Sequence, residues 1–258
     1  MSVLVLTSAG GSPGVTTTAV GLTLEWPRDA LLADCNRDPD QAVLAGYLAG
    51  ADPSGRGLPA LALVHREGRS LDSEILRATM PLTSAPPYRS LLPGFVHPAG
   101  SDLFAPVWPA LLDAFQATSA AGTDVIVDGG RIGRTGLPDV LVTRADALVV
   151  CCRTSLRSLA GLRLYLPPLQ DAAREAGTRV GLLLVGDGQP YGAAEIAAQF
   201  QTPIVATVAH DPVAAGVFSE GHPAPRRFAE SPYRRSIVAA ASRLSALAAR
   251  PHARQGAS

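Results

Sequence analysis

The stretch SAGGSPGVTTT, Ser8 to Thr18, joins an apolar run to the Thr-rich start of a second apolar segment. A glycine-rich bend between a strand and a helix leaves backbone amides unpaired at the helix N-terminus, where the helix dipole favours an anion. This arrangement is typical of a phosphate-binding loop. The general loop pattern G-x-x-x-x-G-K-[ST] places Ala9, Gly14, Val15 and Thr16 at its fixed positions, so the lysine is missing.

Short apolar runs recur along the chain and alternate with longer segments of helical composition. Because the runs are apolar at consecutive positions, they predict strands covered on both faces, as in a parallel sheet. The expected strands are residues 3–7, 30–33, 94–96, 124–127, 147–151, 180–185 and 203–208, and the expected helices are residues 16–26, 108–121, 156–176 and 193–200. The alternation predicts an α/β fold, a mostly parallel, doubly wound sheet of about seven strands flanked by helices.

We expect a single domain over residues 1–250 and a disordered tail over residues 251–258. Residues 51–93 are richer in Pro, Gly and Ser, and we interpret them as an excursion over the sheet edge, with a helical piece at residues 71–80. Ser231 and Pro232 are a good N-cap and first-turn pair, so a final helix is expected from there to about Arg250.

The composition limits the classes of function that fit the chain. The 22 basic residues balance the 22 acidic ones, so no overall field draws the protein to nucleic acid or anionic lipid. Every basic residue is arginine, and no lysine elsewhere can replace the missing one. Cys35, Cys151 and Cys152 lack metal-ligand spacing and predict buried thiols in a cytoplasmic protein. The longest apolar stretches are well short of the roughly 20 residues that span a bilayer.

The phosphate loop resembles that of the ParA/MinD group of P-loop ATPases, which reads K-G-G-x-G-K-T-T. Matching positions are Gly11, Gly14, Thr16 and Thr17, whereas Gly10 and Val15 occupy the two lysine positions and Ser12 occupies a glycine position. The remaining matches lie in order along the chain. LLADCNRDPD matches an Asp-containing switch segment at Asp34, and VIVDGGRIG matches a strand that ends in an aspartate at Asp128.

Two later segments extend the resemblance over nearly the whole chain. RADALVVCCRTSLRSLAGL is similar to the group's strand with a Thr- and Ser-containing turn into a helix, and the segment from residue 204 to 237 is similar to its closing segment, with Asp211 and Gly221 in register. The eroded loop looks most like the CpaE/TadZ branch of the group, which positions pilus or secretion machinery, and like its septum-site relatives.

The resemblance implies a nucleotide site for ATP or ADP with Mg²⁺. The nucleotide-binding loop would run from Gly10 to Thr17, with backbone amides at Gly11 to Thr16 around the phosphates. The Thr16 hydroxyl would ligate Mg²⁺, and Asp128 would bind it directly or through a water. Asp34 would lie near the attacking water as the catalytic residue. Loss of one lysine weakens binding by about one to two decades, and efficient hydrolysis is not expected without the fixed charge. A chain that binds no nucleotide remains the alternative, since aspartates also end strands and cap loops.

Arginines at other positions can restore the lost charge. Arg37 and Arg131 follow the two aspartates of the switch segments, and a planar guanidinium binds phosphate oxygens in pairs. The alternative is that both are surface arginines or pair with carboxylates. Asp187, in GDGQPYG, lies where the resemblance implies contact with the base, although a turn is the simpler interpretation.

Other kinds of site have less support. There is no G-x-S-x-G elbow for a hydrolase triad and no His with a ligand-spaced neighbour for zinc. The densest basic patch comprises Arg226, Arg227, Arg234 and Arg235, which would contact DNA phosphates nonspecifically or form a solvated helix face.

The leading hypothesis is a positional or regulatory scaffold with a degenerate P-loop, a pseudo-ATPase with weak or no ATP hydrolysis. We expect a cytoplasmic homodimer, held at the inner membrane only through protein partners of a pilus, secretion or septum machine. The alternatives are an active ATP-dependent dimerisation switch in which arginines replace the lysines, and a DNA-segregation protein of the ParA type. A ligase or kinase of the same superfamily would need a second substrate pocket, and the sequence identifies none.

Overall fold

An eight-stranded sheet forms the centre of the computed structural model, which describes residues 2–10, 13–134, 136–188 and 190–249. The strands lie in the order β3-β4-β2-β5-β1-β6-β7-β8, and all neighbours are parallel except β3 and β4. Their bounds are β1 (Val3–Ser8), β2 (Ala30–Asp34), β3 (Met80–Pro81), β4 (Arg89–Leu92), β5 (Asp124–Arg131), β6 (Ala147–Arg153), β7 (Arg179–Val185) and β8 (Ile204–Val208). The predicted α/β class and doubly wound sheet are confirmed.

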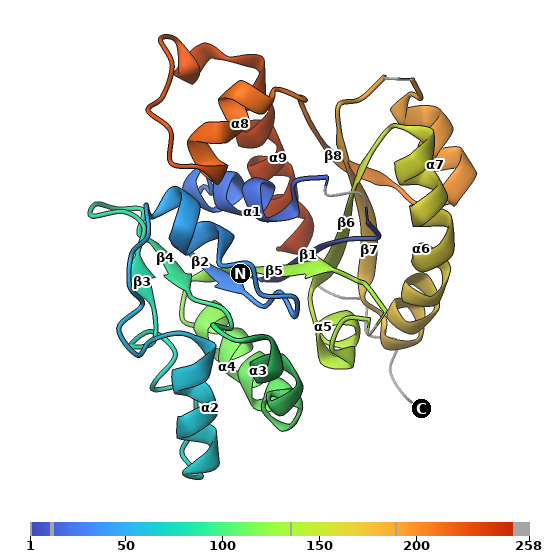
Figure 1. Cartoon of the computed structure of the whole chain (residues 1–258). Helices are drawn as coiled ribbons and strands as arrows, with labels where there is room; N and C mark the ends of the chain where they lie inside the picture. Colours follow the sequence, from blue (N-terminus) through green and yellow to red (C-terminus); the bar gives the residue numbers. More distant parts are fainter. Residues whose placement is uncertain (1, 11–12, 135, 189, 250–258) are drawn as a thin grey trace.

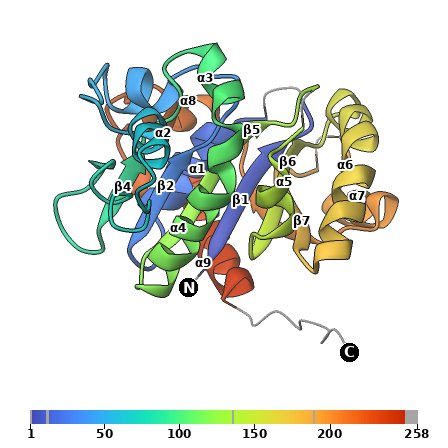
Figure 2. The ribbon, with the colours of Figure 1, turned by 90° about the horizontal axis from the view of Figure 1, so that it is seen from below.

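Helices cover both faces of this sheet. Their bounds are α1 (Val15–Leu24), α2 (Leu58–Arg66), α3 (Pro98–Leu103), α4 (Trp108–Ala120), α5 (Asp139–Thr143), α6 (Leu156–Ala176), α7 (Ala193–Phe200), α8 (Pro212–Ser219) and α9 (Pro232–Ala248), with short turns η1 (Val43–Tyr47), η2 (Ala105–Val107) and η3 (Phe228–Glu230). One apolar cluster joins the sheet to α2, α4, α5 and α6, and a second joins it to α1, α8 and α9. Figure 1 shows the second group above the sheet, and Figure 2 shows α4 and α5 in front of the strands on the opposite face.

The chain reverses its direction across the sheet at β1. β2 and β4 lie on one side of β1, and β6, β7 and β8 follow one another on the other side. In open α/β sheets, ligands bind outside the carboxyl ends of the strands at such a reversal point. The topology therefore places the loop after β1, which contains the quoted phosphate-loop motif, at the position where a ligand is expected.

Two predicted elements are wrong. The strand predicted at residues 94–96 is instead β4, five residues earlier, because Arg89 and Ser90 interrupt the apolar run that the prediction required. Residues 71–80 form hydrogen-bonded turns and the start of β3, whereas the helix in this region is α2. The two-residue strand β3, which was not predicted, brings the sheet from the expected seven strands to eight.

The final helix begins as predicted. The Ser231 hydroxyl accepts a hydrogen bond from the Arg234 amide at 3.1 Å, and α9 ends at Ala248. Arg250 and the predicted tail, residues 251–258, lie outside the described residues. None of the helices in the described part of the chain is long and apolar enough to cross a membrane.

A buried carboxylate fixes the amino ends of β1 and β5. Asp124 is fully buried and accepts hydrogen bonds from the Ser2 amide at 2.8 Å and from Trp26 Nε1 at 2.8 Å. Arg28 donates to the same carboxylate from the solvent side, through Nη2 at 2.6 Å. The polar network at this end of the sheet is structural, because it lies at the opposite end of the strands from the β1 loop.

Candidate functional site

The turn from β1 into α1 depends on one glycine. Gly14 is the N-cap of α1 and has φ 89° and ψ 42°, a left-handed conformation that glycine adopts without a side-chain penalty. The helix begins at Val15, and the Thr18 amide donates to the Gly14 carbonyl at 2.8 Å. Amides of the first turn of α1 therefore face the ligand side of the loop, as an anion site requires.

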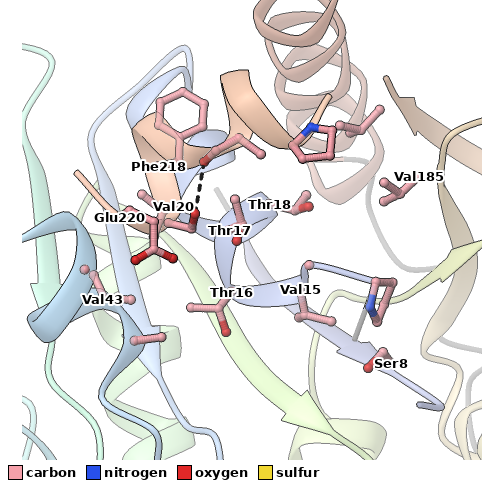
Figure 3. Close-up of a pocket in the computed structure, with 18 of the residues that line it drawn as sticks. Ser8, Val15, Thr16, Thr17, Thr18, Val20, Val43, Val185, Phe218 and Glu220 are labelled. Carbon is pink, nitrogen blue, oxygen red and sulfur yellow. Dashed lines mark hydrogen bonds between the residues drawn. The ribbon is translucent and has the colours of Figure 1, made fainter. Parts of the chain in front are cut away.

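A cavity of about 670 Å³ opens in front of this loop. Its lining comes from the carboxyl ends of β1, β5, β6, β7 and β8, from α1, and from η1 and α8. Figure 3 shows Thr16, Thr17 and Thr18 along the centre of the cavity, with Ser8 and Val15 to one side and Val43 and Glu220 to the other. Its volume is within the range of ligand pockets, about 300 to 1,000 Å³.

Beneath the loop, two carboxylates lie on adjacent strands. Asp34 and Asp128 are in register at the carboxyl ends of β2 and β5. Asp128 is 1% exposed and accepts hydrogen bonds from the Thr16 hydroxyl and, at 2.9 Å, from the Gly130 amide. The structure thus brings together the two groups that were predicted to hold Mg²⁺.

The pKa values of both carboxyl groups are raised, mainly because the groups are buried. Burial raises the pKa of Asp34 to about 8, and the nearby Asp128 and Asp40 carboxylates raise it further, against a hydrogen bond from the Asn36 amide. Burial also raises the pKa of Asp128 to about 6, although the bonds from Thr16 and Gly130 lower it. A dication at this position would favour both ionised forms, because an opposite charge lowers the pKa of a carboxyl group.

Val15, which occupies one of the two lysine positions of the motif, lies in apolar surroundings. Val15 is 6% exposed and packs in the cluster that contains Ala19 and Leu22. Val15 also lines the cavity, so this position contributes an apolar residue and no cation to the lining. Gly10, at the second lysine-equivalent position, follows β1 and is partly exposed, whereas Gly11 and Ser12 lie outside the described residues.

The two arginines that were expected to replace lysine differ in position. Arg131 ends β5 and lines the cavity. Arg37 turns away from it, with Nη1 3.4 Å from the Gly136 carbonyl oxygen and Nη2 3.7 Å from the Asp102 carboxylate. The site therefore contains Arg131, and Arg37 instead connects the β2 loop to α3.

Two further predicted residues have clear local roles. Asp211 lines the cavity and caps α8, because its carboxylate accepts from the Ala214 amide at 3.0 Å. Asp187 is exposed in a turn between Gly186 and Gly188, both with φ 80°, and it is not among the residues described as lining the cavity. The turn interpretation of Asp187 agrees with this geometry.

One arginine of the basic patch Arg226, Arg227, Arg234 and Arg235 is paired with a carboxylate. Arg234 donates to Glu25 through Nε at 2.6 Å and through Nη2 at 3.0 Å. Arg226, Arg227 and Arg235 are exposed. The guanidinium of Arg234 thus connects α9 to the end of α1, and three arginines of the patch remain exposed to solvent.

Several cavity residues were not predicted from the sequence, among them Asn36, Arg153, His210 and Tyr233. Asn36 is buried against Gly130, where an added Cβ would lie 2.1 Å from its Oδ1. Burial, and to a lesser extent Asp211, raise the pKa of Tyr233 to about 12. Arg153 lies two residues after the predicted strand 147–151, and this position near a carboxyl strand end was the signal that could have identified it.

The residues present fit a Mg²⁺-bound polyphosphate in most respects. The helix N-terminus, the Thr16 hydroxyl with Asp128, and a cavity of sufficient volume are in place. The loop itself contributes no cation. Basic groups in the lining come instead from the ends of β5 and β6, at Arg131 and Arg153.

A scan against protein-family models gives no match to this sequence, and a search of curated proteins also gives none. Solved structures do match over nearly the whole chain. The ParA-family ATPase from Chlorobium tepidum is 17% identical, with a TM-score of 0.70 over 93% of this chain and 98% of that one. The septum site-determining protein MinD with Mg-ADP from Pyrococcus horikoshii is 16% identical, with a TM-score of 0.67 over 96% and 97%.

A third match concerns a protein with bound ATP. The McdA–ATP complex from Cyanothece is 17% identical, with a TM-score of 0.66 over 95% of this chain and 96% of that one. At these identities the matches establish the architecture. The chain has the P-loop fold of MinD and the ParA-family ATPases.

Proposed function

We propose that this protein is a nucleotide-binding positional scaffold of the ParA/MinD type with weak or no ATP hydrolysis. The observation that carries the proposal is the 670 Å³ cavity, which is lined by the first turn of α1 with an apolar Val15 in place of lysine. Its lining residue Thr16 donates a hydrogen bond to the buried Asp128. The bound molecule would be ATP or ADP with Mg²⁺. Structural neighbours with Mg-ADP and ATP support this choice of ligand.

Binding and hydrolysis place different demands on the site. Backbone amides and the helix dipole contribute to binding of any phosphate, whereas phosphoryl transfer depends on fixed positive charge that meets the developing charge. Bound Mg²⁺ would neutralise part of the phosphate charge. The loop of this chain retains the backbone amides and the helix N-terminus that bind phosphate, and it lacks the fixed positive charge that phosphoryl transfer requires.

Self-association is part of the proposal, as is action through partner proteins. Leu156, at the start of α6, is 67% exposed, and Val213, at the start of α8, is 76% exposed. Both helices begin at the carboxyl edge of the sheet, where the cavity opens. They are exposed apolar side chains at this edge, on opposite faces of the sheet, and would be covered by a second copy of the chain that docks over the edge. A structural neighbour, the MinC:MinD cell division complex from Aquifex aeolicus, supports the expectation of protein partners. We propose pilus, secretion or septum machinery as the partner class.

The test combines binding with turnover. Mg·ATP at 1 mM should raise the melting temperature of the wild-type protein, because a ligand that binds only the folded state stabilises it. Thr16→Ala should lose this shift. Phosphate release by the wild type should stay at the level of Thr16→Ala. The absence of any shift with either nucleotide would overturn the binding proposal.

The rival function is an active ATPase switch, and the presence of Arg131 in the cavity favours it. It predicts steady-state phosphate release that disappears in both Thr16→Ala and Asp128→Ala. Release at the same rate in wild type and in both variants would come from a contaminant and would exclude this rival.

A further inference from the structure

Two arginines flank the end of the strand that leads into the phosphate loop. Arg131 of β5 is in register with Ser8, the last residue of β1. On the other side of β1, Ser8 is in register with Cys151 of β6, and Arg153 ends β6 two residues further on. Ser8, Arg131 and Arg153 all line the cavity.

The strand alternation fixes the face from which Arg153 leaves β6. Val149 and Cys151 pack in the cluster that contains α1, α8 and α9, whereas Val150 and Cys152 pack in the cluster on the other face. Successive side chains of a strand point to opposite faces, so Arg153 leaves on the α1 side. This is the face on which the phosphate loop opens.

The side chain of Arg153 is available to a ligand. It is exposed, and among the ion pairs between described residues none involves Arg153. Its backbone is fixed, because the Arg153 amide donates to the Ser158 hydroxyl at 3.1 Å, and the next residue, Thr154, donates to the Gly186 carbonyl at 2.6 Å. A free guanidinium thus extends from an anchored backbone.

The charges in the cavity lining are separated. The acidic lining residues Asp40, Asp211 and Glu220 lie next to η1 or at the two ends of α8, while Arg131 and Arg153 come from the strands that flank β1. In Figure 3, Glu220 and Val43 lie on one side of Thr16 and Thr17, and Ser8 lies on the other. A polyphosphate would therefore be attracted by the two arginines at the β5–β1–β6 end and repelled by the carboxylates next to η1 and α8.

From this geometry we infer that Arg153 is a phosphate-binding residue that replaces the loop lysine, with Arg131 opposite it. The inference rests on the proposed function, since the ligand is the same Mg-bound nucleoside polyphosphate. A guanidinium binds two phosphate oxygens at once, so a contact from β6 can replace a point charge from the loop. The phosphate loop of this chain is thus complete only with residues from neighbouring strands.

The test is calorimetric titration of Mg·ATP into wild type, Arg153→Ala, Arg153→Lys and Arg157→Ala. A charge-assisted hydrogen bond corresponds to roughly a tenfold to hundredfold change in affinity, so Arg153→Ala should weaken binding by at least tenfold. Arg153→Lys should restore part of the loss. The matched control, Arg157→Ala, should bind as the wild type does, because Arg157 is exposed in the first turn of α6 and is not among the described lining residues.

The outcomes separate this inference from the proposed function. Wild-type binding that is lost in Thr16→Ala but unchanged in Arg153→Ala would overturn the role of Arg153 and leave the nucleotide site intact. No binding by the wild type would overturn both. Circular dichroism and melting temperature should be the same for Arg153→Ala and wild type, because the side chain is exposed, and this measurement excludes misfolding as the cause of a loss.

Discussion

Asp34 and Asp128 lie side by side at the carboxyl ends of β2 and β5, and burial raises the pKa of both carboxyl groups. Their proximity is a property of the fold, because the two strands are hydrogen-bonded neighbours, although 94 residues separate the two positions in sequence. Two carboxylates held together in this way destabilise the folded chain once both are ionised.

The first prediction follows from this pair and concerns stability against pH. Between the unfolded pKa of about 4 and the folded pKa of about 8, the folded state binds more protons than the unfolded state, so stability should fall as pH rises. Asp34→Asn removes the ionisable group and should flatten this decline. Urea unfolding at pH 5, 6, 7 and 8 measures it. A wild-type free energy of unfolding that increases over this range would contradict the prediction.

The second prediction concerns the close contact between η1 and α8. A Cβ on Gly46 would lie 1.9 Å from the Ser219 carbonyl oxygen, so Gly46→Ala must displace one of these segments. The expected loss of stability is about 1 to 3 kcal/mol. Gly161→Ala is the control, because a Cβ there meets nothing within 4 Å and alanine favours the interior of α6. It should stabilise the protein by about 0.5 to 1 kcal/mol in the same denaturation series.

The third prediction concerns the network at the other end of the strands. Asp124→Ala leaves the Ser2 amide and Trp26 Nε1 without their acceptor in a buried site, and it should cost about 3 kcal/mol of stability. Arg28→Ala should cost less, about 1 kcal/mol or below, because the Arg28 side chain is 40% exposed. If both variants lost the same free energy of unfolding in chemical denaturation, the buried hydrogen bonds of Asp124 would not stabilise the protein more than its ion pair with Arg28 does.

The fourth prediction tests self-association through the edge at which the cavity opens. Leu156→Asp and Val213→Asp should lower the dimer fraction in sedimentation velocity with Mg·ATP present, because each places a charge in an apolar contact. Leu164→Asp is the matched control, since Leu164 is 73% exposed on the same helix α6 but two turns further from the edge. A dimer fraction that falls equally in all three variants, or in none, would place the interface elsewhere.

The sequence predicted the sheet class because the strands that matter most are continuous apolar runs. β1, β5, β6 and β7 are buried on both faces and were identified within a few residues. β4 was misplaced because Arg89 is buried through hydrogen bonds to the Trp26 and Tyr88 carbonyl groups, a compensation that apolarity does not reveal. Local patterns also predicted the cap of α9 at Ser231.

The sequence could predict only those parts of the candidate site whose residues are neighbours in the chain. Gly14, Thr16 and Thr17 lie within four consecutive residues at the start of α1, so their common position follows from the motif. Arg153 enters the site through the register of β6 with β1, which depends on pairings across the whole sheet. Arg37 was expected there because it follows Asp34, but its side chain points instead to Asp102 of α3.

The proposed function requires that this phosphate loop bind a nucleotide without a lysine. Calorimetric titration of the wild-type protein with Mg·ATP, beside Thr16→Ala, tests it most directly. We expect saturable binding with a dissociation constant between micromolar and submillimolar, one to two decades weaker than a loop with its lysine would give, and its loss in Thr16→Ala. Absence of heat up to millimolar Mg·ATP, or equal binding by the variant, would contradict it.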